Sequence, residues 1–130
     1  MKDNKFKLPE EWLKQSSYDF ETAEALFKTG RYIYTVFMCH LAVEKSLKAF
    51  YAKMFKKDSS KTHDLIYLVK KVELELPSQH RDFLEDLNGL SVPVRYPEKI
   101  ANLLKQYKKE NIKGLLNKTR ELLSWLRKLI

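Results

Sequence analysis

Apolar residues recur at three- and four-residue intervals along most of this chain, and proline and glycine rarely interrupt them. Such spacing places the apolar side chains on one face of an α-helix. The first segment of this kind runs from Pro9 to Lys28. Proline suits the first helical turn, and the following Thr29-Gly30 is typical of a helix end. The pattern therefore predicts an amphipathic helix over residues 9–28.

The longest apolar stretch covers residues 31–56 and contains neither proline nor glycine, which predicts a second, longer helix. Thr62 is the expected N-cap of a third helix that ends before Pro77. A fourth helix is expected from Ser78 to about Leu87. Two further helices are expected over 98–107 and 112–130, and the last has a clear apolar seam.

Residues 91–97 interrupt this helical pattern because they hold two prolines, Pro93 and Pro97. Proline removes a backbone donor and restricts the residue before it, so an ordinary helix interior is excluded here. An ordered loop or extended segment is expected instead. Taken together, the segments predict an all-α fold in one domain over residues 1–130. Its core should span about 10–128, and residues 1–8 should be flexible.

Composition narrows the class of protein further. The chain has 130 residues and a net charge of +8, which favours acidic partners such as a nucleotide or nucleic acid, or serves solubility alone. A single cysteine, Cys39, excludes a disulfide within the chain and a cysteine-based metal site, so no metal or cofactor is expected. No apolar run has the length of a membrane span, and a cytoplasmic protein without membrane contact is expected.

One carboxylate in the second helix lies where an apolar side chain is expected. At about 100° per residue, Glu44 falls within the broad apolar face of that helix, together with His40 and Lys48. A buried carboxylate is costly unless a cation or donor pairs with it. Lys48 is one turn away, and Arg95 lies in the proline-flanked segment. An inert ion pair at the edge of the face is the alternative to a polar pocket.

Several short motifs occur in an order that resembles the HEPN family over residues 10–128. They are Trp12, Ser16, Asp19 and Ala23, then Gly30-Arg31-Tyr32, the run from His40 to Ala49, His63-Asp64-Leu65 with Leu68, and Arg95-Tyr96-Pro97. The resemblance is to the small stand-alone prokaryotic members. It implies an up-and-down helical bundle in which two long antiparallel helices carry most of the core and three or four shorter helices complete it. It also implies a homodimer packed around the site.

The same resemblance implies nucleotide binding, and a minimal nucleotidyltransferase as partner, often as toxin and antitoxin. Many members are metal-independent ribonucleases that carry an arginine followed, after four to six residues, by a histidine. This chain departs from that motif: eight residues separate Arg31 from His40, and no histidine follows Arg95. Because the reaction needs arginine to hold the phosphate and histidine to move a proton, catalysis of that type is not expected.

The favoured hypothesis is therefore a homodimeric module that binds a nucleotide or RNA and pairs with a nucleotidyltransferase. An RNA-cleaving toxin with a non-standard site and a purely structural scaffold are the alternatives. Arginine recognises phosphate with two parallel hydrogen bonds, and an adjacent aromatic ring can stack on a base. The candidate ligand-binding residues are Arg95, Glu44, Lys48, His63, His40, Tyr96 and Lys45. The lysines and arginines between residues 105 and 128 are expected to form a solvated face.

Overall fold

The structure is a computed structural model that describes residues 5–95 and 100–130. It contains seven helices and no strand within those ranges, which confirms the predicted all-α class. The helices are α1 (Pro9–Lys28), α2 (Tyr32–Phe55), α3 (Leu65–Lys71), α4 (Ser78–Gly89), α5 (Ser91–Arg95), α6 (Ile100–Gln106) and α7 (Lys109–Leu129). Residues 1–8 are expected to be flexible, and residues 1–4 of this segment lie outside the described residues.

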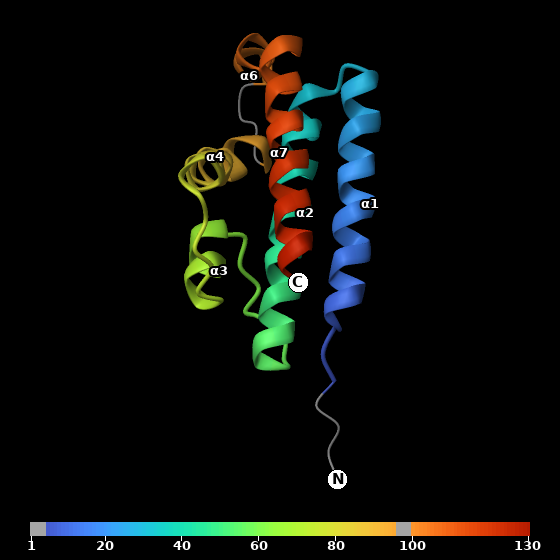
Figure 1. Ribbon diagram of the computed structural model, residues 1–130. Helices are drawn as coiled ribbons and strands as arrows, with labels where there is room; N and C mark the ends of the chain where they lie inside the picture. Colours follow the sequence, from blue (N-terminus) through green and yellow to red (C-terminus); the bar gives the residue numbers. More distant parts are fainter. Residues whose placement is uncertain (1–4, 96–99) are drawn as a thin grey trace.

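Three long helices form the frame of the molecule, and both α1 and α7 pack against α2 (Figure 1). The helices α1 and α2 form an antiparallel pair of the kind that the family resemblance implies, and α7 adds a third helix of similar length. Gly30 has φ +78°, which suits glycine, and the N–H of Arg31 donates to the carbonyl of Leu26 at 2.8 Å. These two features close the turn between α1 and α2.

The close approach of α1 and α2 rests on small side chains at their contact. Ala23, Ala42 and Ala49 have no exposed surface. The hydroxyl of Ser16 donates to the Ala42 carbonyl at 2.7 Å and lies 2.8 Å from the hydroxyl of Ser46. Two buried hydroxyls therefore satisfy each other and a main-chain carbonyl, as buried polar groups require. Larger side chains at these positions would separate the helices.

The four shorter helices cover the remaining side of α2, and two boundary predictions for this region are wrong. The N-cap of α3 is Asp64 rather than Thr62, because the Asp64 carboxylate accepts from the N–H groups of Ile66 and Tyr67. Residues 91–95 form the one-turn helix α5 rather than a loop. Pro93 is its third residue, so the missing N–H is one that no intrahelical bond would use.

Within the described residues, no helix combines the length and the apolar character needed to cross a membrane. The same residues hold no group of three or more His, Cys, Asp or Glu side chains arranged for a metal ion. Cys39 is fully buried, and burial raises the pKa of its thiol to about 12. Because the thiolate is the reactive form, Cys39 acts as a small core residue.

Candidate functional site

A buried carboxylate on α2 lies at the centre of a cluster of basic side chains. Glu44 is 3% exposed. Its Oε2 accepts from Lys48 Nζ at 3.1 Å, and its Oε1 lies 2.9 Å from His63 Nδ1 and 3.6 Å from the terminal nitrogen of Arg95. The prediction that this carboxylate needs a cationic partner is confirmed, and both candidates, Lys48 and Arg95, lie beside it. What the cluster binds remains to be proposed.

Three separate parts of the chain bring these groups together. Glu44 and Lys48 are one turn apart on α2, in the order that favours an ion pair. His63 immediately precedes the N-cap of α3, and its side chain is 56% exposed. Arg95 is the last residue of α5, and its side chain is 14% exposed. The cluster therefore has a buried carboxylate at its floor and partly exposed basic side chains at its edge.

Asn88 of α4 fixes the start of α3 and with it the position of His63. Its amide oxygen accepts from the N–H of Leu65 at 2.8 Å, and its amide nitrogen donates to the Asp64 carboxylate at 3.2 Å. The same Asp64 oxygen caps α3. Asn88 is not among the residues predicted from the sequence, because nothing local indicates a hydrogen-bond partner 23 residues away.

Replacing Asn88 with alanine is expected to lower the free energy of unfolding by about 1–2 kcal/mol, because the half-buried N–H of Leu65 loses its acceptor. Urea denaturation of the variant measures this change. Asn111→Ala is the matched control, since that exposed amide contacts only the carbonyl of Gln106. Equal stability of the two variants would contradict the role given to Asn88.

His40 lies beside the cluster as a neutral, buried imidazole. It is 1% exposed, and its Nδ1 lies 3.7 Å from Glu44 Oε1, too far for a hydrogen bond. Neither ring nitrogen has a hydrogen-bond partner among the described residues. Burial lowers the pKa of His40 to about 4, although the neighbouring Glu44 carboxylate and Asn88 side chain oppose the shift. His40 is therefore uncharged at neutral pH.

Arg95 keeps unused hydrogen-bonding capacity next to two aromatic rings. Its buried Nε and one terminal nitrogen have no hydrogen-bond partner in the described part of the chain. Its guanidinium carbon lies 4.7 Å from the centre of the Phe37 ring. Tyr34, Phe37, Val94 and Arg95 line a pocket of about 230 Å³. The arrangement places a partly desolvated cation with free donors against an aromatic wall, where an anionic group can be recognised.

Two of the predicted site residues do not join this cluster. Lys45 points toward α1, where its Nζ lies 2.7 Å from a carboxylate oxygen of Asp19. Tyr96 lies outside the described residues, so its predicted stacking role stays a prediction. Conversely, Tyr34 and Phe37 line the pocket but are not among the site residues predicted from the sequence. Their three-residue spacing could have indicated a shared stripe, but not that Arg95 would reach it.

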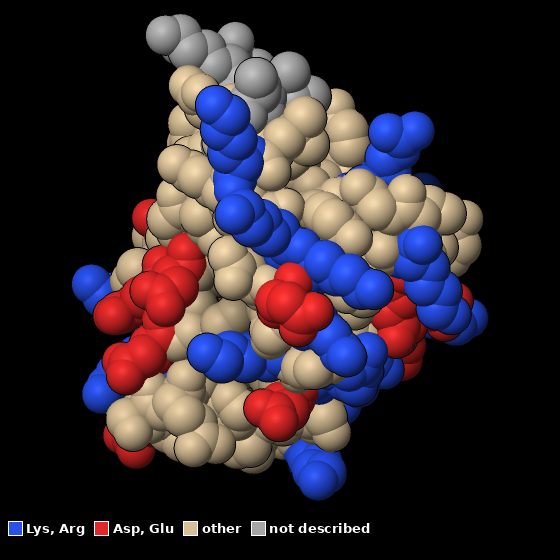
Figure 2. Space-filling view, turned by 90° about the horizontal axis from the view of Figure 1, so that it is seen from above, with Lys and Arg blue, Asp and Glu red and all other residues tan. Residues whose placement is uncertain are grey.

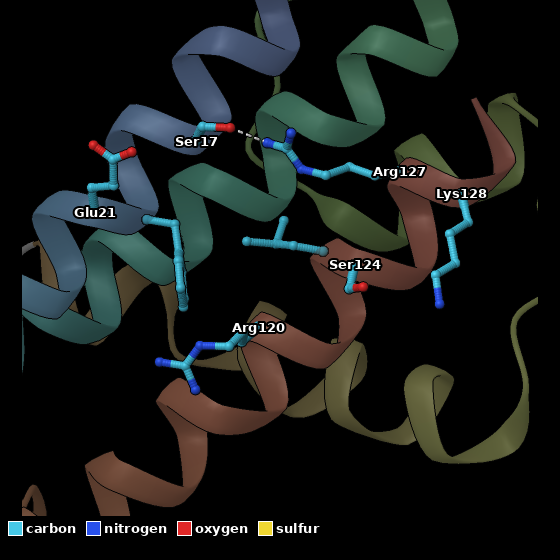
Figure 3. A pocket seen from close by; sticks show the side chains of 8 residues that line it. Ser17, Glu21, Arg120, Ser124, Arg127 and Lys128 are labelled. Carbon is cyan, nitrogen blue, oxygen red and sulfur yellow. Dashed lines mark hydrogen bonds between the residues drawn. The ribbon is translucent and has the colours of Figure 1, made fainter.

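A larger groove of about 450 Å³ lies between α1 and α7, with Phe20 and Leu123 among its apolar lining residues (Figure 3). Its two arginines already have partners on α1. Arg120 donates to a glutamate at 3.0 Å, and Arg127 donates to the Ser17 hydroxyl. Because these guanidinium groups bridge the two helices, the groove offers less free donor capacity than the Arg95 pocket does.

Comparison with known proteins decides the family. The family model of the HEPN domain matches residues 9–129. The chain belongs to the HEPN family. The resemblance read from the motifs of the sequence is thereby confirmed. None of the curated proteins that were compared matches the chain.

Two solved structures share the fold of this HEPN protein. TT1696 from Thermus thermophilus has a TM-score of 0.80 and 17% identity, with 94% of this chain and 98% of that chain covered. ST0689, described as an archaeal HEPN homologue, has a TM-score of 0.75 and 21% identity, with 95% and 98% covered. At these identities the likeness concerns the fold, so the function must be argued from the cluster around Glu44 and Arg95.

Proposed function

We propose that this HEPN protein is a module that binds a nucleotide or RNA, with Arg95 as the phosphate-binding residue. The observation that supports this most is the guanidinium of Arg95, which is 14% exposed, meets the Glu44 carboxylate only at 3.6 Å and lies 4.7 Å from the centre of the Phe37 ring. The accessible part of this guanidinium can donate to a phosphate, and a base finds a stacking surface on the same wall.

The buried carboxylate has a positioning role in this proposal. Glu44 holds Lys48 and His63 directly and attracts Arg95 from 3.6 Å. Because this separation is longer than a good hydrogen bond, the guanidinium is oriented without being saturated. An incoming phosphate then competes with one distant carboxylate oxygen rather than with a bidentate ion pair. His63, at the rim, can donate to the same phosphate when protonated.

The oligomeric state and the protein partner belong to the same proposal. We expect a homodimer that pairs with a minimal nucleotidyltransferase, as in a toxin–antitoxin pair. Exposed apolar side chains beside the pocket support a contact with another protein, since Tyr34 is 49% and Val92 65% exposed. Sedimentation at micromolar concentration tests the homodimer, and a monomer would contradict it. Co-purification with a co-expressed nucleotidyltransferase encoded by the neighbouring gene tests the partner.

Replacing Arg95 with alanine is expected to weaken nucleotide binding by about tenfold or more, because the variant lacks the charged donors for the phosphate. Calorimetric titration with ATP and GTP measures the affinity. Arg81→Ala is the matched control, because Arg81 is an exposed arginine of α4 that does not line this pocket. Absence of saturable binding to the unaltered protein would support a structural scaffold, and equal affinity of the two variants would contradict the role of Arg95.

An RNA-cleaving toxin is the second candidate, and one observation favours it. The Glu44 carboxylate lies 2.9 Å from Nδ1 of the half-exposed His63, which leaves the other ring nitrogen available for proton transfer near Arg95. Incubating the protein with total RNA tests this function beside the variants Arg95→Ala and His63→Ala. Cleavage that both variants abolish would establish the enzyme and replace the binding module.

A further inference from the structure

The proposed pocket is lined by residues of α2 that lie within two helical turns of a strongly basic end of the molecule, and we infer from this that the ligand is a single-stranded nucleic acid rather than a mononucleotide. The inference rests on the proposed function of the Arg95 pocket. It assigns a path to the strand: one nucleotide occupies the pocket of Arg95, Phe37 and Tyr34, and the following phosphates cross the end of the bundle.

That end is where the turn between α1 and α2 meets α6 and the start of α7, at the top of Figure 1. Six basic residues belong to these segments and all are exposed: Lys28, Arg31, Lys105, Lys108, Lys109 and Lys113. Residues 28–31 and 105–113 contain a single acidic residue, Glu110. Six positive charges less one negative charge leave +5 at this end, out of +8 for the whole chain.

The view onto this end shows lysine and arginine side chains gathered in a band across the surface, with few acidic side chains between them (Figure 2). Three stretches of sequence contribute: the end of α1 with its turn, the last turn of α6, and the first turn of α7 with the residue before it. A concentration of one sign of charge raises the local concentration of a polyanion and steers its approach.

A stripe on α2 connects the basic end to the pocket. Arg31, at the N-cap of α2, precedes Tyr34 and Phe37 at three-residue intervals, so the three side chains follow one another along the helix. At about 1.5 Å per residue, Phe37 lies about 9 Å from Arg31 along the axis, a span of one or two nucleotides. A cation followed by an exposed ring, Tyr34, and a half-buried ring, Phe37, is an arrangement on which unpaired bases can stack.

The pocket itself favours a single-stranded nucleic acid over a mononucleotide or a duplex. Its volume of about 230 Å³ is below the range in which small-molecule sites enclose their ligands, so a mononucleotide would leave most of its surface in water. A duplex would keep its bases paired and away from Tyr34 and Phe37. A single strand uses both features, because one base stacks on the aromatic wall while neighbouring phosphates contact the lysines.

The test compares ligands of increasing length on the intact protein: AMP, a three-nucleotide RNA and a ten-nucleotide single-stranded RNA. The ten-nucleotide RNA is expected to bind about tenfold more tightly than AMP, or better. In the triple variant Lys108→Gln, Lys109→Gln and Lys113→Gln, most of that advantage is expected to be lost, which is a fall in affinity for the ten-nucleotide RNA of roughly tenfold, while AMP affinity stays unchanged. The slope of log affinity against log salt should fall by about 2, at roughly 0.7 for each lost phosphate contact.

The matched control changes the same charge elsewhere, with Lys57, Lys70 and Lys128 replaced by glutamine. All three are exposed and lie outside the basic end. An equal loss in both triple variants would overturn the inference, since the attraction would then come from net charge alone. Equal affinity for AMP and for the ten-nucleotide RNA would overturn it too but would leave the proposed pocket intact. If neither ligand binds, the proposed function itself fails.

A single-stranded DNA and a hairpin duplex of the same length complete the experiment. Binding of the DNA with comparable affinity would keep the inference and identify the shared chemistry as phosphates and stacked bases. Tighter binding of the duplex than of either single strand would overturn it, because the aromatic stripe would then play no part. Circular dichroism of each variant at the titration temperature establishes that the helices are intact.

Discussion

Replacing Glu44 with alanine is expected to lower the free energy of unfolding by about 3–5 kcal/mol. The carboxylate is 3% exposed, and three cationic or potentially cationic side chains depend on it. Removing it leaves Lys48 and Arg95, which are 11% and 14% exposed, close to each other without a counter-charge. Repulsion between these partly desolvated cations adds to the lost attraction.

Urea denaturation at neutral pH measures this loss, with Glu85→Ala as the control at an exposed position of α4. Glu44→Gln keeps the shape but removes the charge, so it separates packing from electrostatics. Adding Arg95→Ala to Glu44→Ala is expected to cost less than Arg95→Ala costs in the unaltered protein, since the cation has already lost its partner. A Glu44→Ala variant as stable as the Glu85 control would contradict the buried cluster.

Acidification is expected to destabilise the protein through His40, by about 3 kcal/mol between neutral pH and about pH 4. Burial lowers the pKa of His40 from 6.5 to about 4 in the folded chain. Above pH 6.5 the imidazole is neutral in both states. Between pH 6.5 and about 4 the unfolded chain binds a proton that the folded chain does not, so stability falls as the pH falls.

Unfolding experiments from about pH 7.5 to about pH 4.5 on the unaltered protein and on His40→Leu measure the contribution of this histidine. Leucine has a similar volume and cannot titrate, so the variant is expected to lose less stability on acidification than the unaltered protein. The difference between the two curves removes the contribution of the carboxylates and of the other histidines. Parallel curves would show that His40 accepts a proton in the folded state as readily as in the unfolded one.

Local patterns were sufficient for the long helices. The prediction of residues 9–28 matches α1, and 31–56 differs from α2 by one residue at each end. Apolar periodicity and end signals are properties of consecutive residues, so sequence alone contains them. The same periodicity placed Glu44 on an apolar face. Because a buried carboxylate requires a counter-charge, the need for a partner could also be predicted, and Arg95 was among the partners considered.

Contacts between distant segments decided what local patterns could not. Asp64 rather than Thr62 caps α3, because Asn88 of α4 bonds to the same carboxylate. Because α5 follows α4 almost directly, Pro93 lies in the first turn of a short helix. The N–H of a first-turn residue makes no intrahelical hydrogen bond, so proline is tolerated there. Lys45 was predicted to be a ligand-binding residue, but Asp19 of α1 pairs with its ammonium group instead.

The sequence by itself determined the helical class, the family and the presence of one carboxylate, Glu44, on an apolar helix face. These features follow from residue types and their spacing along the chain. The tertiary structure alone placed Arg95 against Phe37, and it brought the lysines of α6 and of the start of α7 to the same end of the bundle as the turn that contains Arg31. Electrostatic and stacking interactions depend on distance in space. Side chains far apart in the sequence acquire a common function only when the packing of α2 brings their helices together.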